Sequence, residues 1–202
     1  MDKNTNKVID LRHVDPASLG AREKILRTAV ILFNRNGVHT TGIDKIIAEA
    51  GVAKMTFYKH FPSKMLLIEA YLENQEEMCF TNMAHFTVER SADPKEQVLG
   101  VFDFLEQWFK DPDFTGCAFA RGLSDFGDDK SSGAYQRVQA FYGRYAAFFE
   151  ERLYKFMKPA KTKIVVPQLM SLVAGSIVSA VATGDAKIAQ VNKLLVRTML
   201  EN

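Results

Sequence analysis

The chain of 202 residues contains only two cysteines, one tryptophan and four histidines. Cys79 and Cys117 lie far apart and follow no apparent export signal, so we expect reduced thiols in a cytoplasmic protein rather than a disulfide framework. The histidines show no metal-ligand spacing with each other or with the cysteines, which argues against a metal site. The sequence therefore predicts no metal and no other cofactor.

Uninterrupted apolar stretches of membrane-spanning composition are also missing. The longest uncharged stretch, residues 164–184, contains a proline, a glutamine, three serines and a threonine. Its surroundings give no topology signal, so we expect a helix buried in a protein interface and no membrane segment. Residues 1–20 lack an apolar run of signal-peptide length and are predicted to form a flexible polar arm.

Signatures of catalysis are absent as well. The sequence shows no phosphate-cradling glycine loop, no nucleophile elbow and no paired catalytic carboxylate motif. We therefore expect that the protein is not an enzyme, and an enzyme with an unrecognised site is only a third hypothesis.

Apolar residues recur at helical spacing along the chain, and no stretch alternates with the period of a strand. The expected fold is all-α, with about nine helices. Thr41 followed by Asp44 predicts a side-chain cap for the second helix, and Gly51 its end. The predicted helices cover roughly residues 22–37, 41–51, 54–60, 63–90, 98–109, 117–126, 134–157, 162–183 and 186–200.

Charge is divided unevenly along the chain. Residues 1–70 contain eleven Lys/Arg and seven Asp/Glu, whereas the remaining 132 contain fifteen and seventeen. The stretch from Ala50 to Ile68 carries three lysines and no acid. A short basic face on a nearly neutral protein favours contact with a polyanion, although a solvated helix face has the same composition.

The second and third predicted helices form a helix-turn-helix unit, because a glycine-containing turn joins them. In this unit Phe57 and Phe61 face inward and become core residues. The free face of the third helix then projects Lys54, Thr56, Tyr58 and Lys59, whose side chains can donate hydrogen bonds to phosphates and base edges.

The stretch TTGIDKIIAEAGVAKMTFYKHFPSKMLL resembles the signature of the TetR-type (TetR/AcrR) bacterial transcriptional repressors. The resemblance covers roughly residues 22–71, and the rest of the chain matches only in helix number and order. The chain departs from the family pattern at Ala53, where serine is frequent, and at Met55, where glycine is frequent. Ala53 cannot cap the recognition helix with its side chain, and Met55 either reaches a thymine methyl or blocks a close backbone approach.

The resemblance implies a homodimer whose recognition helices enter successive major grooves of a palindromic operator in double-stranded DNA. Residues 21–66 would form the DNA-binding domain and residues 67–202 a ligand-binding and dimerisation domain. Base reading would fall to Met55, Thr56 and Lys59, and most other contacts to phosphates. The DNA-contacting candidates are Thr40, Thr41, Lys54, Met55, Thr56, Tyr58, Lys59, His60 and Lys64.

Aromatic residues are unusually dense between residues 102 and 149. Such stripes are usually core, but pockets between helices are typically aromatic too, and the resemblance favours a pocket for a small apolar or aromatic effector. The candidate lining residues are Phe102, Leu105, Trp108, Phe109, Phe119, Phe141, Tyr145 and Phe148.

The penultimate predicted helix has a broad apolar face that must be covered in water. A four-helix interface between two subunits would cover it, whereas packing within one subunit is the alternative. The candidate interface residues are Val166, Met170, Val173, Ile177 and Val181.

These patterns together predict a cytoplasmic, dimeric, ligand-responsive transcriptional repressor that a small apolar or aromatic effector releases from DNA. The alternative is a small-molecule binding or interaction protein that retains the helix-turn-helix as a scaffold. Retention of the lysines and Tyr58 favours the repressor.

Overall fold

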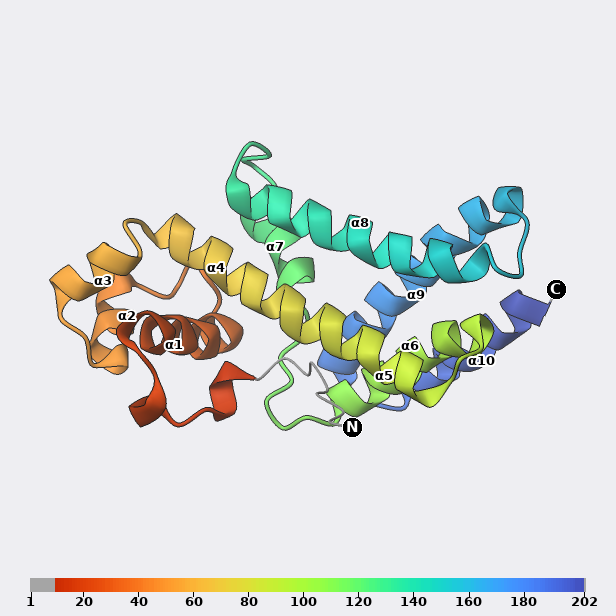
Figure 1. Ribbon diagram of the computed structural model, residues 1–202, viewed down its shortest axis with the longest axis horizontal. Coiled ribbons are helices and arrows are strands. Elements are labelled where there is room, and N and C mark those ends of the chain that lie inside the picture. The colour runs from red at the N-terminus through yellow and green to blue at the C-terminus, as the bar shows by residue number, and fades with distance from the viewer. Residues whose placement is uncertain (1–9, 202) are drawn as a thin grey trace, which may run out of the picture. The chain divides into compact units, whose positions relative to one another are not determined.

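The computed structural model describes residues 10–201, and their secondary structure is helical without a strand (Figure 1). This confirms the predicted all-α fold. A π-helical stretch, Glu77–Thr81, joins α4 to α5 without a break, so the described residues hold nine separate α-helical stretches. The helices are α1 (Ala21–Asn36), α2 (Ile43–Ala50), α3 (Lys54–His60), α4 (Lys64–Glu76), α5 (Asn82–Arg90), α6 (Pro94–Phe109), α7 (Ala118–Phe126), α8 (Gly133–Leu153), α9 (Pro159–Thr183) and α10 (Ile188–Glu201).

The chain divides into two compact units, and the first boundary falls within the π-helical stretch. The first unit contains the described residues up to Cys79 together with Arg121–Gln139. The second unit contains Phe80–Ala120 and the residues from Ala140 onward.

The core of the first unit forms around α1. Ile25, Ala29 and Phe33 lie on one helical face and are buried, and α1 contacts α2, α3 and α4. Phe57 and Phe61 are buried as predicted. Gly37 and Gly51 follow α1 and α2 with φ of 83° and 65°, backbone conformations that glycine adopts without a steric penalty.

The predicted side-chain cap of α2 is wrong. The N-cap residue is Gly42, which makes no side-chain hydrogen bond. Thr41 is fully buried instead, and its hydroxyl donates to the main-chain oxygen of Gly37 at 2.8 Å. Thr41 therefore fixes the turn between α1 and α2 rather than the start of α2.

The caps of the next two helices agree with the sequence. Ala53 precedes α3 and provides no side-chain cap. Ser63 caps α4, because its hydroxyl accepts a hydrogen bond from the Leu66 amide at 3.2 Å. The recognition helix of the predicted helix-turn-helix is thus a short helix without a side-chain cap, followed closely by a capped one.

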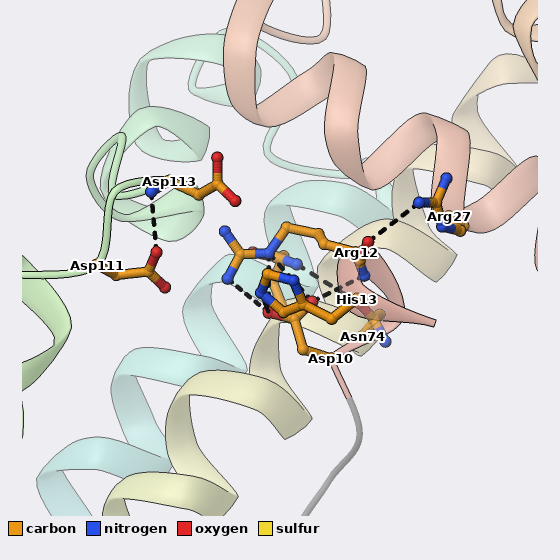
Figure 2. Close-up of polar contacts among 8 residues, drawn as sticks. Asp10, Arg12, His13, Arg27, Asn74, Asp111 and Asp113 are labelled. Carbon is orange, nitrogen blue, oxygen red and sulfur yellow. Dashed lines mark hydrogen bonds and ion pairs between the residues drawn. The ribbon is translucent and has the colours of Figure 1, made fainter. Parts of the chain in front are cut away.

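Two 3-10 helices, Leu11–His13 and Pro16–Ser18, precede α1; residues 1–9 of the predicted polar arm lie outside the described residues. The guanidinium of Arg27 on α1 donates to the main-chain oxygen of Arg12 at 3.1 Å (Figure 2). It also donates to the main-chain oxygen of Val14 at 3.2 Å. Burial alone would raise the pKa of Asp10, but hydrogen bonds and charge from Arg12 lower it. The segment before α1 is therefore fastened to α1 by polar contacts.

The second unit is built on α6, which contacts α5, α9 and α10. Val98, Leu99 and Phe102 of α6 are fully buried. Asp103 on the same helix accepts hydrogen bonds from Lys193 at 2.7 Å and Gln190 at 3.0 Å. These two contacts fasten α10 to α6.

Among the described residues, α9 is the one helix long and apolar enough to cross a membrane by length and composition. However, 39% of its most apolar window is buried within the structure, and α9 contacts α6 and α10. The helix begins at Pro159, three residues before the predicted start, because proline fits the first position of a helix. These contacts make α9 a packed helix of the second unit.

Candidate DNA-binding face and effector region

The exposed surface of α3 carries the predicted DNA-contacting residues. Met55, Tyr58 and Lys59 are spaced i, i+3 and i+4, so they share one helical face, here called the reading face. All three are exposed, whereas Phe57 on the opposite side is buried. The reading face therefore presents a thioether, a phenol and an ammonium group together.

Packing supports the ring of Tyr58. Its centroid lies 5.3 Å from that of Phe57 in an edge-on arrangement, and 40% of Tyr58 remains exposed. Contact with the buried Phe57 thus holds the ring of Tyr58 in place on the reading face.

Lys54 lies at the start of α3, and its ammonium is 3.6 Å from a carboxylate oxygen of Asp44 on α2. Both side chains are well exposed, so this ion pair is worth little and competes weakly with another anion. Lys54 is therefore available for a phosphate contact.

The other predicted DNA-contacting residues differ in how far their side chains are exposed. Thr41 is excluded as a side-chain contact, because it is fully buried. Thr40 is exposed, and its hydroxyl donates to the main-chain oxygen of Asn36. Thr56, His60 and Lys64 are half-buried. Burial lowers the pKa of the Lys64 ammonium.

A polar network within the first unit was not predicted from the sequence. Arg121 of α7 donates to the main-chain oxygen of Asn34 at 2.9 Å, and the Tyr71 hydroxyl donates to Asn34 Oδ1 at 2.7 Å. His39 Nε2 lies 3.1 Å from the main-chain oxygen of Asp125. No spacing rule links residues 87 or 37 positions apart, so only the fold reveals these contacts.

Four of the predicted pocket residues gather in one group of rings in the second unit. Phe119 and Phe141 stack with centroids 3.7 Å apart and an interplanar angle of 4°. Phe80, which the sequence analysis missed, meets Tyr145 and Phe148 edge-on at 6.0 Å. We call this group the aromatic cluster; it contains Phe80, Phe119, Phe141, Tyr145, Phe148 and Phe149.

The remaining predicted pocket residues lie on α6. Trp108 and Phe109 form ring contacts with Phe114, at 5.0 and 4.9 Å between centroids. Phe102 and Leu105 are buried in the core. The ring contacts thus place the aromatic members of the predicted set in two groups, and Trp108 belongs to the group around Phe114.

Two polar groups border the aromatic cluster. The guanidinium carbon of Arg152 lies 3.4 Å from the centroid of Phe148, and Arg152 Nη1 donates to the main-chain oxygen of Phe148 at 3.1 Å. Burial raises the pKa of Tyr142 to about 12, with a further contribution from the charge of Cys117. Tyr142 also meets Phe141 edge-on at 5.7 Å.

The predicted dimer-interface residues require a correction. Val166, Val173 and Ile177 are buried within the chain itself, and Met170 is half-buried, so only Val181 is exposed. The helices α9 and α10 nevertheless expose large apolar side chains, here together called the open face. Its large residues, each more than half exposed, are Ile164, Val178, Val181, Val191, Leu194 and Leu195.

Comparison with known proteins identifies the family. The family model described as bacterial regulatory proteins, tetR family, matches residues 25–71, the segment from α1 into α4. A TetR-family transcriptional regulator from Streptomyces coelicolor superimposes with a TM-score of 0.82 at 26% identity, over 90% of this chain and 94% of that chain. The chain belongs to the TetR family.

Curated HTH-type transcriptional regulators match part of the chain. The regulator LmrA of Bacillus subtilis is 45% identical over 58 residues, which are 28% of this chain and 31% of LmrA. The regulator YerO of the same organism is 32% identical over 78 residues, which are 39% of this chain and 27% of YerO. The matched segment spans about a third or less of these two relatives.

A putative TetR-type regulator from Streptomyces avermitilis shares the fold, with a TM-score of 0.77 at 24% identity over 91% of this chain and 97% of that chain. All of these proteins are described as transcriptional regulators, in agreement with the prediction that this chain is not an enzyme.

Proposed function

We propose that this TetR-family protein is a cytoplasmic, ligand-responsive transcriptional repressor that binds a palindromic operator as a homodimer. The observation that carries the proposal is the reading face, because Met55, Tyr58 and Lys59 are exposed together within the segment that matches the family model. In a helix-turn-helix, the second helix lies in the major groove and its first residues contact base edges. Residues 21–66 are therefore assigned to DNA binding.

Phosphates and bases would be bound by different members of the candidate set. Lys54 and Lys59 are exposed cations, and the Tyr58 hydroxyl is a donor on the same surface. Such groups position a protein on the duplex through its phosphates. His60 and Lys64 are half-buried at the edge of this surface and would add contacts to the backbone.

The open face of α9 and α10 is the surface proposed for dimerisation. Ile164 and Val178 are fourteen positions apart, so they share one helical face, and Leu194 and Leu195 extend the surface on the adjoining α10. Apolar patches of this kind mark association sites in soluble proteins. A second copy packed on this face would bury it, and the pair would present two recognition helices to two half-sites.

The aromatic cluster and its surroundings are proposed as the effector region within residues 67–202. Stacked and edge-on rings with a tyrosine hydroxyl and a guanidinium at their border resemble the lining of small-molecule sites, which are apolar with a few polar groups. An apolar or aromatic effector fits these rings, and its binding would release the operator.

The DNA assignment can be tested by the salt dependence of binding to a selected duplex. Because each phosphate contact adds about 0.9 to the slope of log affinity against log salt, a dimer that loses one contact per subunit should lose about 1.8. We expect Lys59→Ala to reduce both the affinity and this slope, and Tyr58→Ala to weaken binding without unfolding the protein.

Lys163→Ala is the matched control, since Lys163 is an exposed lysine on α9 outside the helix-turn-helix. It should leave the slope unchanged. Wild-type affinity in a folded Tyr58→Ala, Lys59→Ala double variant would refute the proposed function. Effector binding without any DNA binding would instead favour the alternative of a small-molecule binding protein.

A further inference from the structure

Met55 occupies an unusual position for a large apolar side chain. It is 83% exposed, the highest value among the large apolar residues that the structure describes. The core does not use it, because the inner positions of α3 and the following turn are filled by the buried Phe57 and Phe61. Met55 therefore contributes little to folding and is available for a contact at the surface.

The groups around Met55 indicate the chemistry of its partner. Lys59 lies one helical turn away on the same face, and Lys54 precedes Met55 at the start of α3. Residues 50–68 contain no acid. An apolar protein partner would have to bury these cations, whereas a polyanion with an apolar group at its surface would satisfy both kinds of side chain.

Double-stranded DNA provides such an apolar group in its major groove. The 5-methyl group of thymine lies at the base edge, whereas cytosine carries only hydrogen at the same carbon. The first residues of a recognition helix contact the base edges, and Met55 is the second residue of α3. A thioether is flexible and polarisable, so it can pack closely against a methyl group.

We propose that Met55 is a specificity-determining residue that reads the 5-methyl group of a thymine in each half-site of the operator. This inference rests on the proposed function and deepens it. Met55 distinguishes thymine from cytosine by apolar contact alone, while Lys59 and Tyr58 provide the polar contacts around it.

The test removes single methyl groups from the DNA and the thioether from the protein. Duplexes that bind the full chain are first selected from a random library. Each thymine of the selected duplex is then replaced, in both half-sites together, by deoxyuridine, which lacks only the 5-methyl group. Dissociation constants are measured for the wild type, Met55→Ala and Met55→Leu.

One symmetric pair of positions should respond in the wild type. Burial of one methyl group corresponds to about a fourfold change in affinity per half-site, hence about 15-fold for both. The same replacement should leave the affinity of Met55→Ala unchanged, and Met55→Leu should keep most of the response because it retains an apolar side chain. Since Met55 is exposed, both variants should fold, which circular dichroism checks.

The outcomes separate this inference from the proposed function. A methyl response that is equal in the wild type and Met55→Ala, or no response at any thymine, would overturn the role of Met55 while operator binding stands. A selection that enriches no duplex would overturn the proposed function and this inference with it.

Discussion

Arg121 Nη1 donates a hydrogen bond to the main-chain oxygen of Asn34, at a distance of 2.9 Å. Asn34 lies in the last turn of α1, where carbonyl groups have no partner within the helix. A cation at this end also interacts favourably with the helix dipole. Because α1 contacts α2 and α3, Arg121 supports the helix on which the helix-turn-helix is packed.

Removal of this contact should destabilise the first unit. We expect Arg121→Ala to lower the free energy of unfolding by about 1.5–2 kcal/mol, the lower part of the range for hydrogen bonds to charged groups, because Arg121 is half-buried. Tyr71→Phe, which removes only the hydroxyl that donates to Asn34 Oδ1, should cost about 1 kcal/mol. Urea denaturation followed by circular dichroism measures both effects.

Arg121→Lys is the conservative control for that experiment. Lysine keeps the charge but lacks the forked guanidinium, so it should restore part of the lost stability. The Arg121→Ala, Tyr71→Phe double variant should deviate from additivity because both groups contact Asn34. Unchanged stability in Arg121→Ala would show that the network does not support α1.

The open face should control the oligomeric state. Val178→Asp with Leu194→Asp would place charges where apolar surfaces meet, and an unpaired buried charge is costly. We expect a folded monomer in sedimentation velocity and a large loss of operator affinity, because a monomer spans one half-site.

Val88→Asp is the matched control, since Val88 is an exposed valine on α5 outside the open face. It should remain dimeric. By contrast, Val173→Asp should reduce the stability of the subunit itself, because Val173 is buried within it. A soluble Val178→Asp, Leu194→Asp variant that sediments as a dimer would place the interface elsewhere.

The free energy of unfolding at alkaline pH should depend on Tyr142. Its pKa in the folded chain is about 12, above the ordinary value of 10, because burial disfavours the phenolate. Between these values the unfolded chain releases a proton that the folded chain keeps, so the stability present below pH 10 is lost as the pH rises toward 12. Tyr142→Phe should flatten this loss in urea titrations from pH 9 to 12, and an unchanged slope would contradict the assignment.

Turn-forming and capping residues made the helix-turn-helix segment predictable from the sequence. The bounds of α3 agree with prediction, because glycine and proline act within a few residues of their positions. The role of Thr41 was not predictable, since the choice between capping α2 and bonding Gly37 depends on the path of the turn.

The face of α9 that turns inward was also not predictable. The helix is uncharged from Ile164 to Thr183 and apolar on several sides, so periodicity does not distinguish the buried Val173 from the exposed Val178. The contacts of Phe80 and Arg121 likewise depend on tertiary packing between distant segments.

Trp108, the only tryptophan of the chain, can report effector binding through its fluorescence. Trp108 meets Phe114 edge-on at 5.0 Å and lies in the same unit as the aromatic cluster. A small aromatic compound that binds the proposed effector region should change Trp108 emission and lower operator affinity over the same concentration range. Linkage requires the operator to weaken binding of the compound by the same factor, typically about 5- to 150-fold.

Variants inside and outside the aromatic cluster show whether both readouts report one site. Phe141→Leu should weaken both the emission change and the release of the operator, because it removes the ring stacked on Phe119 while keeping an apolar side chain. Phe86→Leu is the control, since Phe86 contacts Phe104 outside the aromatic cluster, and it should affect neither. If compounds that change Trp108 emission leave operator affinity untouched, and Phe141→Leu alters neither response, the aromatic cluster is ordinary core and the effector lies elsewhere.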